Sequence, residues 1–327
     1  MTAGTSRRPA AGRSRTARTA MASVAAVVAS MLVLSACGDQ TNEAIARREA
    51  QKHRNVHAPL FKMLPKDVQD KGFLQVGSDM TYKPVEFRTN GQIAGIDPDL
   101  ARAMEKTLGI KLNFNNATFD TLMGGLKSQR YDIAMSAMTD TKDRQEGIDS
   151  TTGKKIGAGV DFVDYLNVGV SLYTQKGKTQ GIDGWDTMCG KKLAVQRGTV
   201  SHDLANAKSK ACQKSGSQPI SIEAFDNDSE AQTRLRTGGV DAVSSDYPVA
   251  AYAVNVSGGG KDFQMVGGAP LKAAPYGIAV PKGQAKLRDA LKAAVELTIK
   301  NGSYAEVLKK WDVKDAAVKE VQLNGGS

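Results

Sequence analysis

Cys37 has the most distinctive chemical setting in the chain, because of the residues in front of it. Residues 1–36 hold five arginines and no acidic residue, and an uncharged apolar run covers 20–34. The run leads into Leu34-Ser35-Ala36, directly before the cysteine. A basic stretch, a short apolar core and small residues at its end are typical of a secretory signal, and the core is too short for a comfortable membrane span. We therefore expect residues 1–36 to be removed, which leaves a thiol at the first mature position.

That thiol is a candidate for lipidation. The Leu-Ser-Ala-Cys ending resembles the lipobox of bacterial lipoproteins, which implies a diacylglyceryl group on Cys37, cleavage before it and acylation of the new N-terminus. Several acyl chains on one residue anchor a protein stably where one chain is marginal. An ordinary signal followed by an incidental cysteine stays open as the alternative. We expect a lipid-anchored protein on the extracytoplasmic face of the cell membrane, with 37–57 as lipidated cysteine and polar tether.

The two other cysteines, Cys189 and Cys212, are a candidate disulfide. Exported proteins fold in an oxidising compartment, where a pair of thiols tends to be joined. The bridge would close a loop of about 24 residues and add about 3 kcal/mol to the unfolding free energy by the chain-entropy argument. Two separate buried thiols remain the alternative.

Charge and composition narrow the function classes. The whole chain has a formal charge of +10, and without residues 1–36 it has 291 residues and a charge of +5. This mild excess is spread along the chain, and no basic block with interleaved aromatic residues indicates nucleic-acid binding. The three histidines show no metal-ligand spacing, so we expect no metal and no cofactor. No second apolar run approaches the length of a membrane span.

Alternating strands and helices are expected between residues 73 and 136. The expected elements are a strand over 73–78, a helix from Asp97 to Lys106 closed by Gly109, a strand over 111–115, a helix capped by Asp120 and ending near Lys127, and a strand over 131–136. An acidic cap, proline at the first helical position and glycine after the last turn are typical helix signals. The β-α-β-α-β order predicts a largely parallel sheet with helices on its faces.

The same pattern recurs further along the chain. The expected elements are strands over 168–173, 191–196, 220–224, 240–244 and 276–280, helices over 201–212, 228–237, 283–300 and 303–310, and a further helix after Ser245-Asp246-Tyr247-Pro248. Two similar α/β lobes joined by extended strands predict a cleft between them. Ligands of open α/β sheets bind at the carboxyl ends of the strands, which would line that cleft.

Residues 73–320 resemble the amino-acid-type solute-binding proteins of ABC importers (extracellular solute-binding family 3). The segments that carry the resemblance are LQVGSDMTYKPVEF (74–87), GIDPDLARAMEKTLG (95–109), FDTLMGGLKSQRYDIAMSAMTDTKDR (119–144), LAVQRGTVS (193–201), VDAVSSDYP (240–248) and NGSYAEVLKKWDV (301–313). The family implies a two-lobed periplasmic-binding-protein-like fold, with a mostly parallel sheet flanked by helices in each lobe and hinge strands between the lobes. We expect lobe 1 to comprise 58–174 and 268–327, and lobe 2 to comprise 175–267.

The resemblance also implies which residues hold a free amino acid. Arg144 would pair with the α-carboxylate, Thr139 would add a hydroxyl, and Ser136 and Ala137 would give backbone contacts. Asp246 from lobe 2 would take the α-ammonium. The remaining implied contacts are Tyr82 and Phe119 around the ligand side chain, Asp79 at its polar end, and Gln196, Thr199 and Val200 on the lobe 2 wall.

The chemistry of Arg144 and Asp246 suits a zwitterion independently of the family. Arginine presents a planar fork of donors that fits a carboxylate, and aspartate offers only acceptors, which suit an ammonium. Aromatic faces cover aliphatic stems or attract a cationic one. Each residue also has a plainer interpretation: Arg144 as a solvated residue at a helix start, Asp246 as a helix cap, Tyr82 as loop packing and Phe119 as core.

Two departures from the family pattern limit the prediction of a ligand. Residues 147–160 (GIDSTTGKKIGAGV) are longer than the usual link and are expected to form a protruding hairpin. Val200 and Ser245 carry no decisive charge. Asp79 and Asp140 favour a polar or basic side chain without selecting one amino acid.

The function implied is capture of an amino acid by cleft closure and its delivery to an ABC permease and its ATPase, by a monomer that performs no chemistry on the ligand. One rival is an enzyme of the same fold, like the cyclohexadienyl dehydratases, which would need a general acid or base in the cleft. Another is a surface lipoprotein that senses a ligand. Fold alone does not separate these functions.

Overall fold

A computed structural model of the chain describes residues 49–150, 152–268 and 270–327. The chain divides into two compact units, residues 1–52 and 53–327, and the second contains the α/β fold. The predicted signal, Cys37 and the tether up to residue 48 lie outside the described residues.

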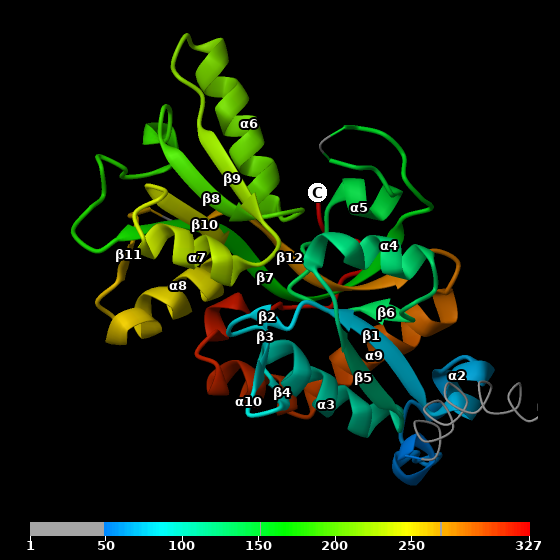
Figure 1. The fold of residues 1–327 in the computed structure, drawn as a ribbon. Coiled ribbons are helices and arrows are strands. Elements are labelled where there is room, and N and C mark those ends of the chain that lie inside the picture. The colour runs from blue at the N-terminus through cyan, green and yellow to red at the C-terminus, as the bar shows by residue number, and fades with distance from the viewer. Residues whose placement is uncertain (1–48, 151, 269) are drawn as a thin grey trace, which may run out of the picture. The chain divides into compact units, whose positions relative to one another are not determined.

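The expected helices and strands are present in the expected order, and the structure adds short elements that the sequence analysis did not predict (Figure 1). The α-helices are α2 (Lys66–Lys71), α3 (Ile96–Leu108), α4 (Leu122–Lys127), α5 (Lys142–Glu146), α6 (Val200–Lys214), α7 (Asp228–Arg236), α8 (Tyr247–Val256), α9 (Ala285–Lys300) and α10 (Ser303–Lys310). The strands are β1 (Phe73–Ser78), β2 (Thr81–Tyr82), β3 (Glu86–Thr89), β4 (Gln92–Ala94), β5 (Lys111–Asn116), β6 (Ile133–Ala134), β7 (Val160–Gln175), β8 (Lys192–Gln196), β9 (Ser221–Phe225), β10 (Ala242–Asp246), β11 (Phe263–Met265) and β12 (Leu271–Pro281). Short 3-10 turns are η1 (Phe61–Met63), η2 (Phe119–Thr121), η3 (Trp185–Thr187), η4 (Ser257–Gly259) and η5 (Lys314–Ala316).

Nine of the described strands form one mixed sheet, in the order β5-β1-β6-β12-β7-β10-β8-β9, with β11 paired to β7. The pairs β1–β5 and β1–β6 are parallel, as are β8–β9 and β8–β10. Between these parallel groups run the hinge strands β7 and β12, which pair antiparallel with each other. The fold is therefore the predicted two-lobed α/β architecture, but the two lobe sheets are continuous because the hinge strands pair with both.

The helices cover the sheet in each lobe. In lobe 1, α3, α9 and α10 pack together on one side of the strands, while α4 lies on the other (Figure 1). In lobe 2, α6 and α7 pack on β8, β9 and β10, and α8 packs on β7 and β11. This layering is the one that buries the apolar face of each helix against a sheet.

Separate hydrophobic cores underlie the lobes. One cluster is built from residues between Ala58 and Val168 and between Tyr276 and Val321, with Val249 added from lobe 2. Two others run from Val170 to Val266 and from Tyr173 to Phe263. β7 contributes to both sides, since its first half packs in lobe 1 and its second half in lobe 2. The boundaries at 174/175 and 267/268 stay predictions.

Several element boundaries differ from those expected. α3 begins at Ile96, so Asp97 lies inside the helix, where its buried carboxylate accepts from Tyr165 and from the Ala137 amide instead of capping. Asp120 lies in η2 and does not cap α4, whose N-cap position is Thr121. The expected strand over 131–136 forms ladder pairs only at Ile133 and Ala134.

The disulfide between Cys189 and Cys212 is confirmed, with the two Cα atoms 5.6 Å apart. It joins the last turn of α6 to the loop before β8, so both ends of this βα unit are tied together. The expected hairpin over 147–160 is present as an antiparallel bridge between Ile148 and Lys155.

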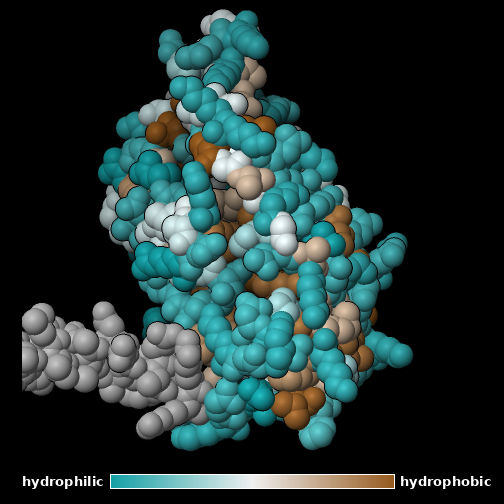
Figure 2. Space-filling model, turned by 90° about the vertical axis from the view of Figure 1, so that its right-hand side faces the viewer, coloured by the Kyte–Doolittle hydropathy of each residue, from teal (hydrophilic) through white to brown (hydrophobic). Residues whose placement is uncertain are grey.

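The face of the molecule in Figure 2 is largely hydrophilic, with scattered hydrophobic residues. The large hydrophobic side chains that are exposed include Ile156, Tyr247, Val256 and Leu271, which come from different elements. None of the described helices combines the length and the hydropathy needed to cross a membrane.

Candidate functional site

One small cavity between the lobes collects most of the residues predicted to bind a ligand. Its lining consists of Tyr82, Phe119, Ala137, Thr139, Arg144, Gln196, Thr199, Val200 and Asp246. The other two predicted residues are connected to this lining, since Asp79 accepts from the Gln196 amide and its own amide donates to the Ser136 hydroxyl. The structure thus brings the predicted set together, and the part each residue plays in binding stays a prediction.

Asp246 is the anionic group of the cavity. It ends β10, and its carboxylate oxygen Oδ2 accepts hydrogen bonds from the Tyr82 hydroxyl at 3.0 Å and the Tyr276 hydroxyl at 2.6 Å. Burial raises the pKa of Asp246 to about 6, while the two phenol hydrogen bonds and the charge of Arg144 lower it. Although Asp246 precedes α8, its side chain makes no capping bond, so its interpretation as a helix cap is wrong.

Arg144 is the cationic group. It lies in α5, whose N-cap Thr141 accepts from the Arg144 amide at 3.3 Å. Its guanidinium donates to the carbonyl of Thr139 at 2.6 Å and, across the cleft, to the carbonyl of Gly198 at 2.9 Å. The guanidinium also lies 5.3 Å from the centre of the Phe119 ring. Burial lowers the pKa of Arg144, and nearby carboxylates oppose that effect, so the group stays charged and is not a solvated helix-start residue.

Asp79 and Gln196 link the lobes at the polar end of the cavity. The Gln196 amide donates to Asp79 Oδ2 at 2.6 Å, and the other Asp79 oxygen accepts from the Thr81 hydroxyl at 2.6 Å. Burial raises the pKa of Asp79, and these hydrogen bonds lower it. A carboxylate held in this way has few free lone pairs, so it could act on a ligand only through its charge or after Gln196 moves.

A buried acidic pair supports the Ser136–Ala137 backbone. Asp97 accepts from the Ala137 amide at 3.1 Å, and Glu86 accepts from the Ser136 hydroxyl at 3.0 Å. Burial and the neighbouring charges of Asp97 and Asp79 raise the pKa of Glu86 well above its usual range, and burial raises that of Asp97 to about 6. The Asp97 hydrogen bond holds Ala137, whose backbone φ is 46°.

The lobe 2 wall is built by the turn between β8 and α6. Thr199 is the N-cap of α6: its hydroxyl accepts from the His202 amide at 3.2 Å and donates to the Gln196 carbonyl at 2.8 Å. Val200 begins the helix. Because capping occupies the Thr199 hydroxyl, this side chain offers a ligand contact surface more than a free donor.

The sequence analysis did not identify three residues that contribute to the site. Tyr276 was expected only as part of a returning strand, yet it holds Asp246. Glu86 and Asp97 were not recognised as supports of the Ser136–Ala137 segment. For Tyr276 the sequence holds no local signal, because its contact depends on where β12 crosses between the lobes. For Asp97, a carboxylate inside an otherwise apolar helix face was the available signal.

The cavity is narrow, because the lobes touch across it. Only about 10 Å³ remains in which the centre of a water molecule can lie, about enough for one water. A larger groove of about 300 Å³ opens beside it at Thr139 and Val200, with Asp143 and Asp203 on its walls. An amino acid therefore fits the cavity only after the lobes separate.

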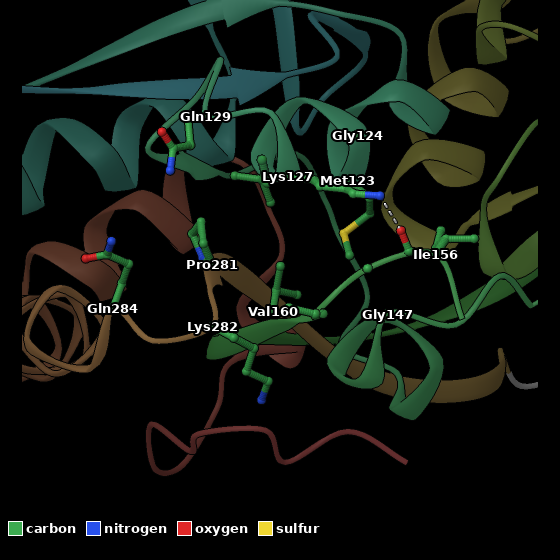
Figure 3. Close-up of a pocket in the computed structure, with 14 residues that line it drawn as sticks. Met123, Gly124, Lys127, Gln129, Gly147, Ile156, Val160, Pro281, Lys282 and Gln284 are labelled. Atoms are coloured by element: carbon green, nitrogen blue, oxygen red, sulfur yellow. Dashed lines mark hydrogen bonds between the residues drawn. The ribbon is translucent and has the colours of Figure 1, made fainter. Parts of the chain in front are cut away.

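A second cavity lies apart from this site, on lobe 1 (Figure 3). It measures about 430 Å³ between α4, the 147–160 hairpin and residues 281–284. The Lys127 ammonium closes one side by donating to the carbonyl of Ile156 at 2.7 Å. Its walls are mainly apolar side chains and glycine backbone. Among the described residues, no group of three or more histidine, cysteine or carboxylate side chains is arranged to hold a metal ion.

Comparisons with known proteins agree with this architecture. The sequence profile of the bacterial extracellular solute-binding proteins, family 3, matches residues 74–314. The arginine-binding protein ArgT of Corynebacterium glutamicum is 29% identical over 93% of this chain and 95% of its own length.

Two solved structures are also similar. An ancestral arginine-binding protein bound to arginine has a TM-score of 0.64 and 33% identity, covering 73% of this chain and 98% of that one. An ancestral amino acid-binding protein described as a precursor of cyclohexadienyl dehydratase has a TM-score of 0.64 and 30% identity, covering 75% and 97%. The profile match spans most of the chain and includes both lobes and the cavity residues, so the chain belongs to the bacterial extracellular solute-binding proteins of family 3.

Proposed function

We propose that the protein captures a free amino acid in the cavity between its lobes and delivers it to the permease of an ABC importer. The observation that carries the proposal is the placement of Arg144 and Asp246, opposite charges from different lobes, on one cavity with two aromatic rings. A zwitterion that bridges the two charges binds the closed arrangement better than the open one, and so shifts the population toward closure.

The contacts that now cross the cleft suggest how closure works. Three hydrogen bonds join the lobes: Tyr82 to Asp246, Gln196 to Asp79, and Arg144 to the Gly198 carbonyl. A bound amino acid would take over these partners: its carboxylate the Arg144 fork and its ammonium the Asp246 oxygens. Such an exchange avoids leaving a buried charge unpaired, which is costly.

For the ligand side chain we propose a polar or basic group, with arginine as the first candidate. Tyr82 and Phe119 would flank an aliphatic or guanidinium stem. The buried carboxylate of Asp79 and the amide of Gln196 at the far end favour a donor. Two of the relatives described above are arginine-binding proteins, which supports the same choice.

We further propose that a lipid on Cys37 keeps the protein at the membrane, close to the permease and its ATPase, which raises its effective concentration there. The lobe boundaries at 174/175 and 267/268 are part of this proposal, since the two cores meet along β7. Cys37→Ala tests the anchor: we expect the protein to move from the membrane fraction into the medium, and a variant that stays on the membrane would refute it.

An enzyme remains the second candidate, because one similar structure is described as a precursor of a dehydratase. Its base would have to be Asp246, since the described lining contains no histidine, lysine or glutamate. In the binding proposal the ligand ammonium engages Asp246, so no base is free. We expect no turnover of prephenate or arogenate, and measurable product would favour the enzyme.

Thermal unfolding of the full-length protein against each common amino acid tests the main proposal. A ligand that binds only the folded state adds about 2.7 kcal/mol to the unfolding free energy at a hundredfold excess over Kd. We expect an upward shift with one or a few amino acids, lost in Arg144→Ala and Asp246→Ala and kept in Arg102→Ala, a matched change on the exposed face of α3. No shift with any amino acid would refute the proposal.

A further inference from the structure

Residues 321–326 lie along the hinge strand β7. The Asp164 amide donates to the Gln322 carbonyl at 3.0 Å, and the Asn324 amide donates to the Phe162 carbonyl at 3.1 Å. The Asn324 side chain also accepts from the Phe162 amide at 2.7 Å. Val321 is buried in the lobe 1 core. The segment is thus fixed to the strand that joins the lobes.

Gly325 and Gly326 then bring the segment into contact with Asp140 and with Gln145 of α5. The Gly325 amide donates to Asp164 Oδ2 at 3.0 Å, and the Gly326 amide donates to Asp140 Oδ2 at 2.8 Å. The Gln145 side chain donates to Asp140 Oδ1 at 2.6 Å and reaches the Gly326 carbonyl at 3.4 Å. A closed set of hydrogen bonds therefore joins residues 325–326 to the helix that carries Arg144.

Only glycine fits at position 326. A Cβ atom there would lie 2.1 Å from the carbonyl oxygen of Asp140, a backbone atom that has no room to move. At position 325 a Cβ would lie 2.7 Å from the Asp164 carboxylate. The close approach of the two backbones is what lets the Gly326 amide reach the buried Asp140 side chain.

The segment that these glycines hold belongs to the candidate binding site. Asp140 separates Thr139, whose carbonyl accepts from the Arg144 guanidinium, from Thr141, whose hydroxyl caps α5 at Arg144. On its other side, the Asp140 amide donates to the carbonyl of Pro275 in β12 at 2.8 Å. Residues 139–145 are therefore held between a hinge strand and the 325–326 glycines.

The side chains of the contact are polar and buried, and Gly326 is buried with them, while Gly325 is exposed. Asp140 is 0% exposed, Asp164 is 2% exposed and Gln145 is 7% exposed. A carboxylate as deeply buried as that of Asp140 needs its N–H partners, because an unsatisfied buried charge is destabilising. Moving Gly326 away would leave Asp140 with a single side-chain donor, and the segment that carries Arg144 would have to rearrange.

We propose that Gly325 and Gly326, with Asp140 and Gln145, form a latch that positions Arg144 for the carboxylate of the ligand. These are positioning residues, since none of them touches the cavity. The inference rests on the proposed function and deepens it, because it makes ligand affinity depend on residues at the far end of the chain from the tether.

The test compares Gly326→Ala with Gly124→Ala in the full-length protein. A Cβ at Gly124 meets nothing within 4 Å, so this change controls for glycine replacement itself. With L-arginine, or whichever amino acid stabilises the protein, we expect Kd to rise at least tenfold in Gly326→Ala and to stay unchanged in Gly124→Ala. Gln145→Ala, which removes one donor without a clash, should raise Kd by a smaller factor.

A second ligand separates positioning from general damage. L-Argininamide has no carboxylate for Arg144, so the ratio of its Kd to that of L-arginine reports this contact alone. We expect the ratio to fall in Gly326→Ala and Gln145→Ala. Wild-type affinity in both variants, or an equal loss for both ligands, would overturn the latch.

Amide hydrogen exchange tests the latch without any ligand. We expect the amides of residues 139–146 to exchange faster in Gly326→Ala than in the wild type, with lobe 2 unchanged. If the wild type binds no amino acid, the proposed function fails, and this measurement still decides the latch. Unchanged exchange over 139–146 would overturn it.

Discussion

The properties of the charged side chains in the candidate site depend on the residues that contact them in the folded protein, and residue type alone does not determine these properties. Asp246 is an ordinary aspartate in the sequence, and its position before α8 is equally suited to capping. In the structure two phenols hold it, one of them from a strand 30 residues further along the chain. The resemblance to a family could predict that Asp246 faces a cleft. It could not predict Tyr276, since that contact follows from how β12 crosses between the lobes.

Proton release on binding should report the state of Asp246. Its pKa of about 6 in the cavity means that it is largely protonated at pH 5, while an ammonium placed against it stabilises the charged form and lowers that pKa. Binding should therefore release close to one proton near pH 5 and none at pH 8. Isothermal titration in buffers of different ionisation enthalpy measures this number.

The same linkage fixes the direction of the pH effect on affinity. Below pH 6 the ligand must displace a proton, so Kd should rise by up to about tenfold per pH unit as the pH falls. Asp246→Asn should bind weakly and release no proton. A Kd for the wild type that stays constant from pH 5 to pH 8 would exclude the ammonium contact.

At the scale of elements, the sequence predicted the order of strands and helices well because both lobes repeat an alternating pattern with clear end signals. The errors lie where side chains serve tertiary contacts. Asp97 and Asp120 have the residue type of helix caps, but the first binds Tyr165 and Ala137 inside the core, and the second lies in a 3-10 turn. The secondary-structure propensity of a short segment carries no information about such long-range partners.

The βα unit formed by β8 and α6 gives an element-scale prediction. Replacing Cys189 and Cys212 with alanine should lower the unfolding free energy by about 3 kcal/mol, because the unfolded chain regains the freedom of the closed loop. Urea denaturation measures the loss. Kd should change little, since the bridge lies at the end of α6 away from Val200 and the cavity. A denaturation midpoint that does not respond to the double replacement would contradict the prediction.

At the scale of the whole molecule, two buried carboxyl groups of lobe 1 have a raised pKa. Burial raises the pKa of Asp97 to about 6 and that of Asp164 to about 7, while in the unfolded chain both would titrate near 3.9. The folded state therefore binds more protons than the unfolded state between about pH 4 and pH 7. The unfolding free energy should be greatest at the acidic end of that window and fall as the pH rises through it.

Asp164→Asn tests this pH dependence at one group. Each unit of pKa difference corresponds to about 1.4 kcal/mol, so the wild type should lose on the order of a few kcal/mol between pH 4.5 and pH 8. The variant has no charge to bury and should unfold at a higher temperature than the wild type at pH 8, with a smaller pH dependence. Asp315→Asn, an exposed change in η5, is the control. Equal pH profiles for the wild type and Asp164→Asn would contradict the account.

The hinge strands have a mechanical consequence. β7 and β12 pair with each other from Val160 and Pro281 to Val170 and Leu271, so the lobes are joined by a two-stranded ribbon and must bend it to move apart. The register between the strands shifts between Leu271 and Ala274 and again between Tyr276 and Gly277, and such irregularities are where a ribbon bends and twists most readily. One of these two flexible points lies at Tyr276, whose hydroxyl donates to Asp246, so bending of the ribbon would act directly on the residue that would hold the ligand.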